Sequence, residues 1–202
     1  ARKIGCLLLE ALSLTGHRLN ELARLPWSQV DRARGVITIP DTSSKNRKPL
    51  VRPITRRIGE ILDELASDSE WVFPGRNLAE DKPIYSTVKL QDEIQERTGI
   101  QATNHDLRRV WASAANRAGL PPLAVKRLLN HLSNAQEVTE GYQIYSLDEL
   151  KDYAQAVEDR ILQDAGLLKP PKDELLHALQ ALSAEERTRI LEQLQGAHHE
   201  HA

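Results

Sequence analysis

The chain has 202 residues, of which 40% are hydrophobic and 28% are charged, a composition that supports a packed core and argues against a disordered chain. No apolar stretch approaches the roughly 20 residues of a membrane-spanning helix, no signal peptide is visible, and the single cysteine, Cys6, excludes a disulfide framework and fits the reducing cytoplasm. The net charge of −2, taken alone, argues against a nucleic-acid-binding protein.

The N-terminal segment is predicted to be helical over residues 3–25. Leucine and alanine residues occur there at helical spacing, and Thr15-Gly16 interrupts the pattern. Thr15 is predicted to cap a second helix, which Pro26 ends.

Two short runs rich in β-branched residues follow, at 36–39 and 50–54. The polar turn 43–49 separates them, so this pattern predicts a small antiparallel sheet. Apolar residues three and four positions apart then predict a helix over residues 56–67, and residues 71–75 are expected to form a buried strand or loop.

The rest of the chain is predicted to be mainly helical, with segments near 86–98, 106–118, 121–130 and 147–164. Residues 166–171 resemble a linker, and one or two amphipathic helices are expected over 173–195, the second capped by Ser183 and Glu186. We therefore expect a mainly α fold with a small antiparallel β-sheet over residues 1–165, followed by a helical C-terminal tail over residues 166–202.

Several side chains are candidates for chemistry, and each also has an ordinary structural interpretation. Arg18 and Glu21 share a helix face. They either form a simple ion pair, or the Arg18 guanidinium is placed to bind an oxyanion. His105 and Arg108, again three positions apart, can bind a phosphate and move a proton near neutral pH. Lys45 is either an exposed turn lysine or a mobile ammonium that reaches a phosphate or a leaving oxygen.

Further along the chain, His131 follows an apolar helical stripe and is equally compatible with a structural and a functional role. Tyr142 lies in a polar segment after a helix. Tyr145, three positions later, is a second candidate for any reaction that uses a tyrosine side chain. The sequence contains no phosphate-binding loop of the G-x-x-x-x-G-K-[ST] type and no Gly-x-Ser-x-Gly elbow. It also lacks the D-x-D or D-D-E spacing of carboxylates that is expected of a two-metal nuclease. The terminal run 198–201 is interpreted as a tag remnant or frayed end, and no metal is expected.

The order of these residues carries more information than any one of them. The chain contains Thr15-Gly16-His17-Arg18-Leu19-Asn20-Glu21-Leu22, then Ser44-Lys45-Asn46, His105-Asp106-Leu107-Arg108-Arg109, Leu128-Leu129-Asn130-His131 and Val138-Thr139-Glu140-Gly141-Tyr142. This set, in this order and over roughly residues 3–164, resembles the catalytic domain of the tyrosine recombinases, the phage integrase family. Asn130 stands where many members have Gly, and Tyr142 follows His131 by eleven residues.

The resemblance implies the tyrosine recombinase catalytic-domain fold and cleavage and rejoining of double-stranded DNA through a 3′-phosphotyrosyl intermediate, without a metal or another cofactor. Arg18 and Arg108 would clamp the phosphate oxygens and Tyr142 would be the nucleophile. His105 would be the general base, Lys45 the general acid, and His131 a hydrogen-bond donor to the phosphate. Glu21 would support Arg18, and the DNA-binding residues would include Arg47, Lys48 and Arg109.

Three other interpretations stay open from the sequence. A type IB topoisomerase-like enzyme would use a similar set of residues, a non-catalytic remnant of the fold would bind DNA without cleaving it, and a helical interaction domain would do neither. The resemblance also implies an upstream DNA-binding domain, which we expect to be absent from this chain, and self-association into a tetrameric synapse in the full-length protein. The tail is equally compatible with packing on its own domain or on a neighbouring protomer.

The net charge hides an uneven distribution. Residues 1–136 contain 21 Lys and Arg against 15 Asp and Glu, and residues 137–202 contain 6 against 14. We therefore predict a basic, DNA-facing body with an acidic C-terminal part. The predicted basic cluster consists of Lys45, Arg47, Lys48, Arg52, Arg56 and Arg57, with Arg108 and Arg109 near the site.

Overall fold

The computed structural model of the chain describes residues 2–39, 50–130, 145–169, 182–183 and 186. Its contacts divide the chain into two compact units, Ala1–Ile161 and Leu162–Ala202. The first unit is mostly helical with one small antiparallel sheet, which confirms the expected fold class.

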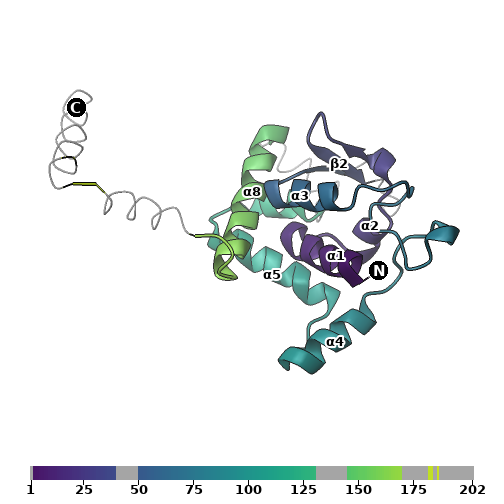
Figure 1. Ribbon diagram of the computed structural model, residues 1–202. Helices are drawn as coiled ribbons and strands as arrows, with labels where there is room; N and C mark the ends of the chain where they lie inside the picture. Colours follow the sequence, from purple (N-terminus) through teal and green to yellow (C-terminus); the bar gives the residue numbers. More distant parts are fainter. Residues whose placement is uncertain (1, 40–49, 131–144, 170–181, 184–185, 187–202) are drawn as a thin grey trace. The chain divides into compact units, whose positions relative to one another are not determined.

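Helix α1 (Arg2–Thr15) is central to the first unit. It contacts α2 (Leu19–Ala23), α3 (Arg56–Glu64), α4 (Val88–Thr98) and α5 (Asn104–Arg117), as Figure 1 shows. Its apolar residues recur at helical spacing and are buried against these neighbours, which gives the unit much of its core. The buried residues of α1 are Leu7, Leu8, Leu9, Ala11, Leu12 and Leu14.

The junction between α1 and α2 differs from the sequence prediction. The Thr15 hydroxyl donates a hydrogen bond of 2.6 Å to the carbonyl oxygen of Ala11, so it is used inside α1. The N-cap of α2 is Arg18, whose extended backbone precedes the helix. The prediction that Thr15 caps α2 is therefore wrong.

The sheet consists of β1 (Val30–Asp31), β2 (Val36–Ile39) and β3 (Leu50–Pro53), paired antiparallel in the order β1-β2-β3. A single 3₁₀ turn, η1 (Trp27–Gln29), leads into β1. The register places Ile37 of β2 opposite Arg52 of β3. The two predicted strands and their antiparallel pairing are confirmed.

After α3 the chain forms an isolated bridge between Pro26 and Trp71 and a short 3₁₀ turn, η2 (Leu78–Glu80), before α4 begins. Helices α6 (Pro122–Leu128) and α8 (Leu147–Asp164) complete the described helices of this region. The predicted helices near 86–98, 106–118, 121–130 and 147–164 are thus confirmed, with boundaries that differ by a few residues at most.

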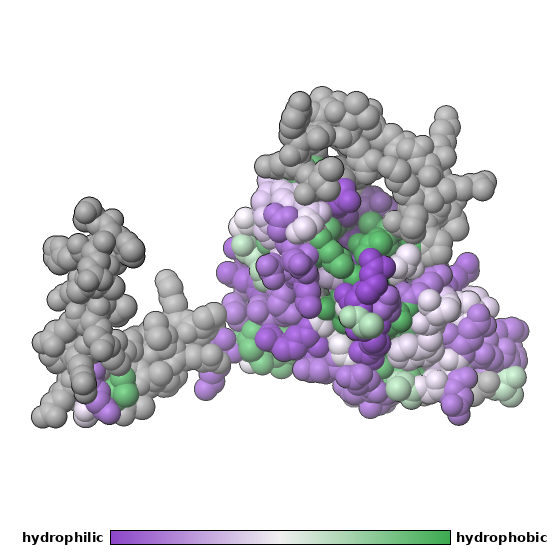
Figure 2. Space-filling view, turned by 90° about the horizontal axis from the view of Figure 1, so that it is seen from above, coloured by the Kyte–Doolittle hydropathy of each residue, from purple (hydrophilic) through white to green (hydrophobic). Residues whose placement is uncertain are grey.

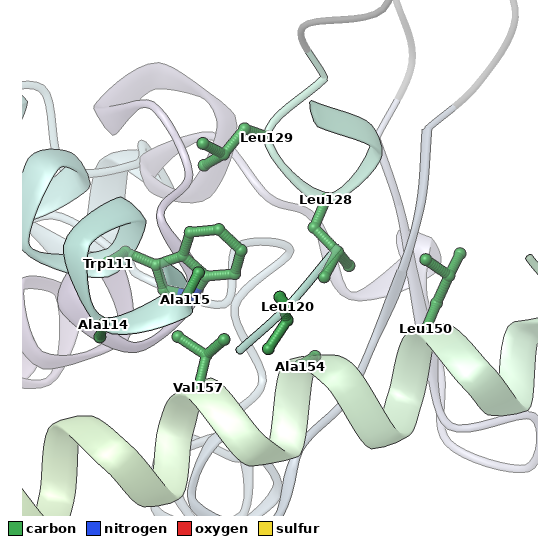
Figure 3. Packing of buried hydrophobic residues seen from close by; sticks show 9 residues of the cluster. All are labelled: Trp111, Ala114, Ala115, Leu120, Leu128, Leu129, Leu150, Ala154 and Val157. Atoms are coloured by element: carbon green, nitrogen blue, oxygen red, sulfur yellow. The ribbon is translucent and has the colours of Figure 1, made fainter. Parts of the chain in front are cut away.

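A second part of the core lies where α5, α6 and α8 meet. Figure 3 shows Leu150, Ala154 and Val157 projecting from one face of α8 toward Trp111 of α5 and Leu120. The Trp111 side chain is 1% exposed, and its Nε1 donates a hydrogen bond of 3.0 Å to the carbonyl oxygen of Leu14. This bond ties α5 to the end of α1, directly beside the α1–α2 junction.

Side chains of α8 cap the N-terminus of α3. Gln155 Oε1 accepts a hydrogen bond of 2.9 Å from the backbone N–H of Arg56, and Glu158 Oε1 accepts one of 2.9 Å from that of Arg57. Glu158 is fully buried and also accepts from the Thr55 hydroxyl. Because the first N–H groups of a helix lack partners within the helix, α8 supplies acceptors that the local sequence of α3 does not.

Figure 2 shows one face of the protein, on whose coloured surface hydrophilic residues predominate and hydrophobic residues gather in smaller groups. In the second unit, Ser183 Oγ and the Ser183 backbone N–H each donate a hydrogen bond of 2.8 Å to Glu186 Oε2. This confirms the predicted capping pair. The remainder of the predicted helical tail lies mainly outside the described residues and stays a prediction.

Candidate active site

Arg18 lies at the start of α2, in the loop that follows α1. Its backbone N–H donates a hydrogen bond of 2.8 Å to Glu21 Oε2, and its Nη1 forms an ion pair of 2.9 Å with Glu21 Oε1. The Arg18 side chain is 53% exposed, whereas that of Glu21 is 16% exposed. Glu21 thus caps the helix and fixes the position of a guanidinium that remains open to solvent.

Gly16 has a backbone conformation that few residues adopt. Its φ is +65°, in the left-handed region, and a Cβ atom at this position would lie 2.9 Å from side-chain atoms of Trp111 and Leu129. The close approach brings the Gly16 carbonyl to α5. Glycine is therefore the residue that fits between Thr15 and the charged loop.

Arg108 is buried on α5 and links three parts of the chain. Its Nη1 donates to the carbonyl oxygen of Gly16, and its Nη2 donates to the carbonyl oxygen of Leu129, at the end of α6. Desolvation, followed by the positive charge of Arg18, lowers the pKa of Arg108. Arg18 and Arg108, which are 90 positions apart in sequence, are thus brought into electrostatic range.

His105 lies in the first turn of α5, three positions before Arg108, and is exposed. The turn is fixed by Thr103, whose backbone N–H donates a hydrogen bond of 3.0 Å to Asp106 Oδ2. Arg109 is also exposed and its Nη1 lies 3.2 Å from Asp106 Oδ1. The predicted placement of His105 and Arg108 on one helix is confirmed, and the DNA-binding role of Arg109 stays a prediction.

Asn130 has a φ of +52°, so the residue directly before His131 is in the left-handed region. Asn and Gly adopt this region more readily than other residues, which explains in physical terms why either can occupy the position. Lys45, Arg47, Lys48, His131 and Tyr142 lie outside the described residues. Their assignments stay predictions.

The sequence analysis did not assign two residues of this region, His17 and Arg52, to the catalytic site. His17 and Arg52 are 2% and 3% exposed, and both line a cavity of about 20 Å³ together with Trp111. His17 stands inside the Thr15–Leu22 motif, which was a usable signal. For Arg52 the sequence indicated only a member of the basic cluster, because the burial of a charged strand residue depends on contacts that are distant in sequence.

The structure corrects the predicted basic cluster at Arg52 and Arg57. Arg52 is buried. Arg57 forms ion pairs with Glu10, Glu60 and Glu64 at 2.7, 3.0 and 3.2 Å, which raise its pKa. Arg56 remains half exposed but pairs with Asp159 at 2.6 Å. Burial removes Arg52 from a DNA-binding surface, and pairing with three glutamates occupies Arg57, whereas Arg56 stays accessible to solvent.

Tyr145 packs against the core near the start of α8. Its ring meets that of Tyr153 edge to face, with 5.4 Å between the ring centroids. Desolvation, helped by Tyr153 and Glu149, raises the pKa of the Tyr145 phenol. Tyr153 also packs against the core, as its place in the helical pattern predicted.

Among the described residues, no group of three or more His, Cys, Asp or Glu side chains is arranged to hold a metal ion. Within the same part of the chain, every helix is too short or too polar to cross a membrane. Cys6 is exposed and free.

Comparison with known protein families decides the classification. The model of the phage integrase family matches residues 5–144, which is more than half of the chain. The chain belongs to the phage integrase family. The match spans Arg18, Lys45, His105, Arg108 and Tyr142, so the ordered residues that suggested the family all lie within it.

Sequence similarity of this chain to individual integrases and recombinases agrees with the family match. The chain is 28% identical over 171 residues to the prophage integrase IntZ of Escherichia coli (strain K12), covering 80% of this chain and 42% of IntZ. It is 31% identical over 131 residues to the tyrosine recombinase XerD of Rhizobium meliloti (strain 1021), covering 61% of this chain and 42% of XerD. The chain thus spans less than half the length of these relatives.

Solved structures of the family show the same fold. The integrase from mycobacterium phage Brujita superposes with a TM-score of 0.57 at 19% identity, covering 78% of this chain and 52% of that one. A lambda integrase dimer bound to a COC′ core site superposes with a TM-score of 0.51 at 17% identity, covering 72% of this chain and 55% of that one. The expected catalytic-domain fold is confirmed.

Proposed function

We propose that this chain is the catalytic part of a site-specific DNA recombinase or integrase of a phage or another mobile element. Residues 1–165 form its catalytic domain and residues 166–202 an appended helical tail. The observation that carries the proposal is that two arginines from separate elements meet at the α1–α2 junction: Glu21 holds Arg18, and Arg108 of α5 donates to the Gly16 carbonyl two positions before Arg18. The integrase and recombinase names of the relatives favour this activity over that of a topoisomerase.

The two arginines suit the charge that develops in phosphoryl transfer. When a phosphodiester is attacked in line, negative charge grows on the non-bridging oxygens. A planar guanidinium donates two parallel hydrogen bonds to such oxygens, and its charge cannot be lost near neutral pH. The bonds from Arg108 to the Gly16 and Leu129 carbonyls hold its guanidinium in place before DNA binds, which lowers the cost of reorganisation.

In the proposed reaction, Oη of Tyr142 attacks the scissile phosphorus and the bond from phosphorus to the 5′ oxygen breaks. His105 accepts the phenol proton, and Lys45 donates a proton to the departing 5′ oxygen. The products are a 3′-phosphotyrosyl protein–DNA bond and a free 5′-hydroxyl. Because the phosphodiester energy is kept in this bond, rejoining to a new 5′-hydroxyl needs no ATP, and no metal or cofactor is part of the proposal.

The environment of Tyr145 supports Tyr142 as the nucleophile. A raised pKa disfavours the phenolate of Tyr145, and its edge-to-face contact with Tyr153 holds the ring against the core. A nucleophile needs the opposite conditions, namely a freely placed phenol and a stabilised phenolate. The proposal therefore assigns the chemistry to Tyr142.

The proposed partner is double-stranded DNA, gripped in part by Arg47, Lys48 and Arg109. The superposition on the lambda integrase dimer bound to a COC′ core site supports this choice. We also propose that the full-length protein self-associates into a tetrameric synapse on DNA and acts in the cytoplasm, in whose reducing conditions the free thiol of Cys6 would persist.

The experiment that tests the proposal is covalent trapping on DNA. The chain is mixed at low salt with a pool of nicked duplexes of randomised sequence, whose short strand diffuses away after cleavage and prevents rejoining. We expect an adduct that survives denaturant with the wild-type chain and with Tyr145→Phe, and at least a hundredfold less with Tyr142→Phe. Binding without an adduct would instead indicate a non-catalytic DNA-binding protein, and the absence of binding a helical interaction domain.

A further inference from the structure

A third arginine, Arg52, is buried behind the two that the proposed function uses. It lies on β3 directly opposite Ile37, and opposed residues of an antiparallel pair project from the same face of the sheet. Ile37 is 2% exposed in the core, so the side chain of Arg52 is directed inward rather than toward solvent.

Two nitrogens of the buried Arg52 guanidinium lack hydrogen-bond partners in the part of the chain that the structure describes. Its Nε and Nη2 atoms are inaccessible to solvent and make no hydrogen bond, and the same is true of both ring nitrogens of His17. The two side chains line the same small cavity, with Thr55 and Trp111 in its wall. Buried donors are normally satisfied, so an unpaired guanidinium at this place is costly to the folded state.

The charge of Arg52 acts on the residues of the site. Burial, opposed by Glu21 and helped by the positive charges of Arg108 and Arg18, lowers the pKa of Arg52 to about 9. Since an arginine stays protonated, this lowering expresses the cost of keeping a third positive charge beside the other two. His17 stays neutral there, because burial and the charges of Arg52 and Arg108 lower its pKa well below the ordinary value.

An anion at the site would relieve this cost. Among the described residues, three guanidiniums act on one carboxylate, Glu21, which is already paired with Arg18. The charge of Arg52, which forms no ion pair with any described residue, therefore acts on a phosphate bound at this place. This charge favours the transition state over the bound substrate, because the transition state carries more negative charge on the same oxygens.

We propose that Arg52 is a positioning residue of the phosphate site, and that its buried charge strengthens phosphate binding through Arg18 and Arg108. This inference rests on the proposed function. It predicts that the buried charge of Arg52 lowers the free energy of unfolding while it strengthens phosphate binding. A purely structural arginine would not show this combination.

The test compares Arg52→Met, which keeps the length of the side chain without its charge, with Arg52→Lys. The first measurement is the melting temperature in inorganic phosphate against chloride of equal ionic strength, with the 202-residue chain. We expect Arg52→Met to melt at or above the wild-type temperature in chloride but to bind phosphate at least fivefold more weakly. Arg52→Lys should bind more tightly than Arg52→Met.

The second measurement is the single-turnover rate of adduct formation on the duplexes that the wild-type chain selects from the randomised pool. Arg52→Met should react at least tenfold more slowly at saturating DNA, with Arg52→Lys in between. Two controls separate charge from packing: Arg97→Met removes an exposed, ion-paired charge, and Leu14→Met alters the wall of the same cavity. Both should bind phosphate and react like the wild type.

The inference is overturned if Arg52→Met binds phosphate like the wild type, if it melts below the wild type, or if Arg52→Lys is as impaired as Arg52→Met. Absence of a wild-type adduct would reject the proposed function, whereas the phosphate measurement would still decide the role of Arg52.

Discussion

Gly16 connects the backbone of the α1–α2 junction to the arginine on α5. Its positive φ and its close packing on Trp111 and Leu129 place its carbonyl where Arg108 donates to it. Geometry at this one residue therefore fixes the relative position of Arg18 and Arg108.

Replacing Gly16 with Ala should cost about 2–4 kcal/mol in the free energy of unfolding, because the new Cβ both strains the backbone and overlaps neighbouring side chains. Gly35 is the matched control: its φ is +66°, but no atom lies within 4 Å of a Cβ placed there. Gly35→Ala should cost about 1 kcal/mol. Urea unfolding measures both, and equal losses would contradict the packing argument.

His17 makes the stability of the fold depend on pH. Its pKa is lowered in the folded state, mainly by burial, whereas in the unfolded state it should be near 6.5. Between these two values the unfolded chain binds a proton that the folded chain does not. The stabilising contribution of neutral His17 to the free energy of unfolding is thus fully present above about pH 6.5 and is lost as the pH falls below that value.

We therefore expect His17→Leu to lose stability less steeply than the wild type between pH 6.5 and 5, by up to about 1.4 kcal/mol per pH unit. Above pH 6.5 the two proteins should show parallel behaviour. Urea unfolding at pH 7.5, 6.5 and 5.5 measures the difference, and an unchanged slope below pH 6.5 would show that His17 does not resist protonation.

Single residues differ in how far the sequence predicts them. Arg18 and Arg108 were predictable because two charged motifs at fixed places in the chain order are visible without a structure. The burial of His17 and Arg52 was not, because it results from the packing of β3 against the α1–α2 junction and α5.

Among the helices, α3 and α8 depend on each other most directly. Glu158 is fully buried and accepts hydrogen bonds from the Thr55 hydroxyl, from the backbone of Arg57 and from Gln155 Nε2 at 2.9 Å. Removing such an acceptor leaves several buried donors without a partner.

We expect Glu158→Ala to lower the free energy of unfolding by about 2–4 kcal/mol for this reason. The neighbouring Asp159 makes an ion pair with the half-exposed Arg56, and Asp159→Ala should cost at most about 1 kcal/mol. Chemical denaturation of the two variants measures the contrast. A loss for Glu158→Ala no greater than that for Asp159→Ala would argue against the capping role.

The secondary-structure elements were predicted well where apolar spacing determines them, as in α1, α5 and α8. They were predicted poorly where a cap decides the boundary. Arg18 is not among the residues that usually cap a helix, so Thr15 was the natural choice in the sequence. The caps of α3 come from α8, about 100 positions later, and no local pattern reveals them.

At the scale of the whole molecule, the uneven charge distribution of the sequence needs a structural correction. The basic excess of residues 1–136 is real, yet Arg52 is buried and Arg57 is neutralised by three glutamates. The fold instead brings three arginines to the α1–α2 junction: Arg18 pairs with Glu21, Arg108 donates to the Gly16 carbonyl, and Arg52 lines a cavity together with His17. We propose that this group binds a phosphate despite the net charge of −2 of the chain.

The most direct test of the central claim is to locate the covalent bond. The trapped adduct is digested with trypsin and nuclease, and fragmentation of the peptide with its remaining nucleotide in a mass spectrometer identifies the modified residue. The account predicts a phosphotyrosyl bond at Tyr142, linked to the 3′ end of the DNA strand. A bond at Tyr145, at a non-tyrosine side chain, or to a 5′ end would contradict it.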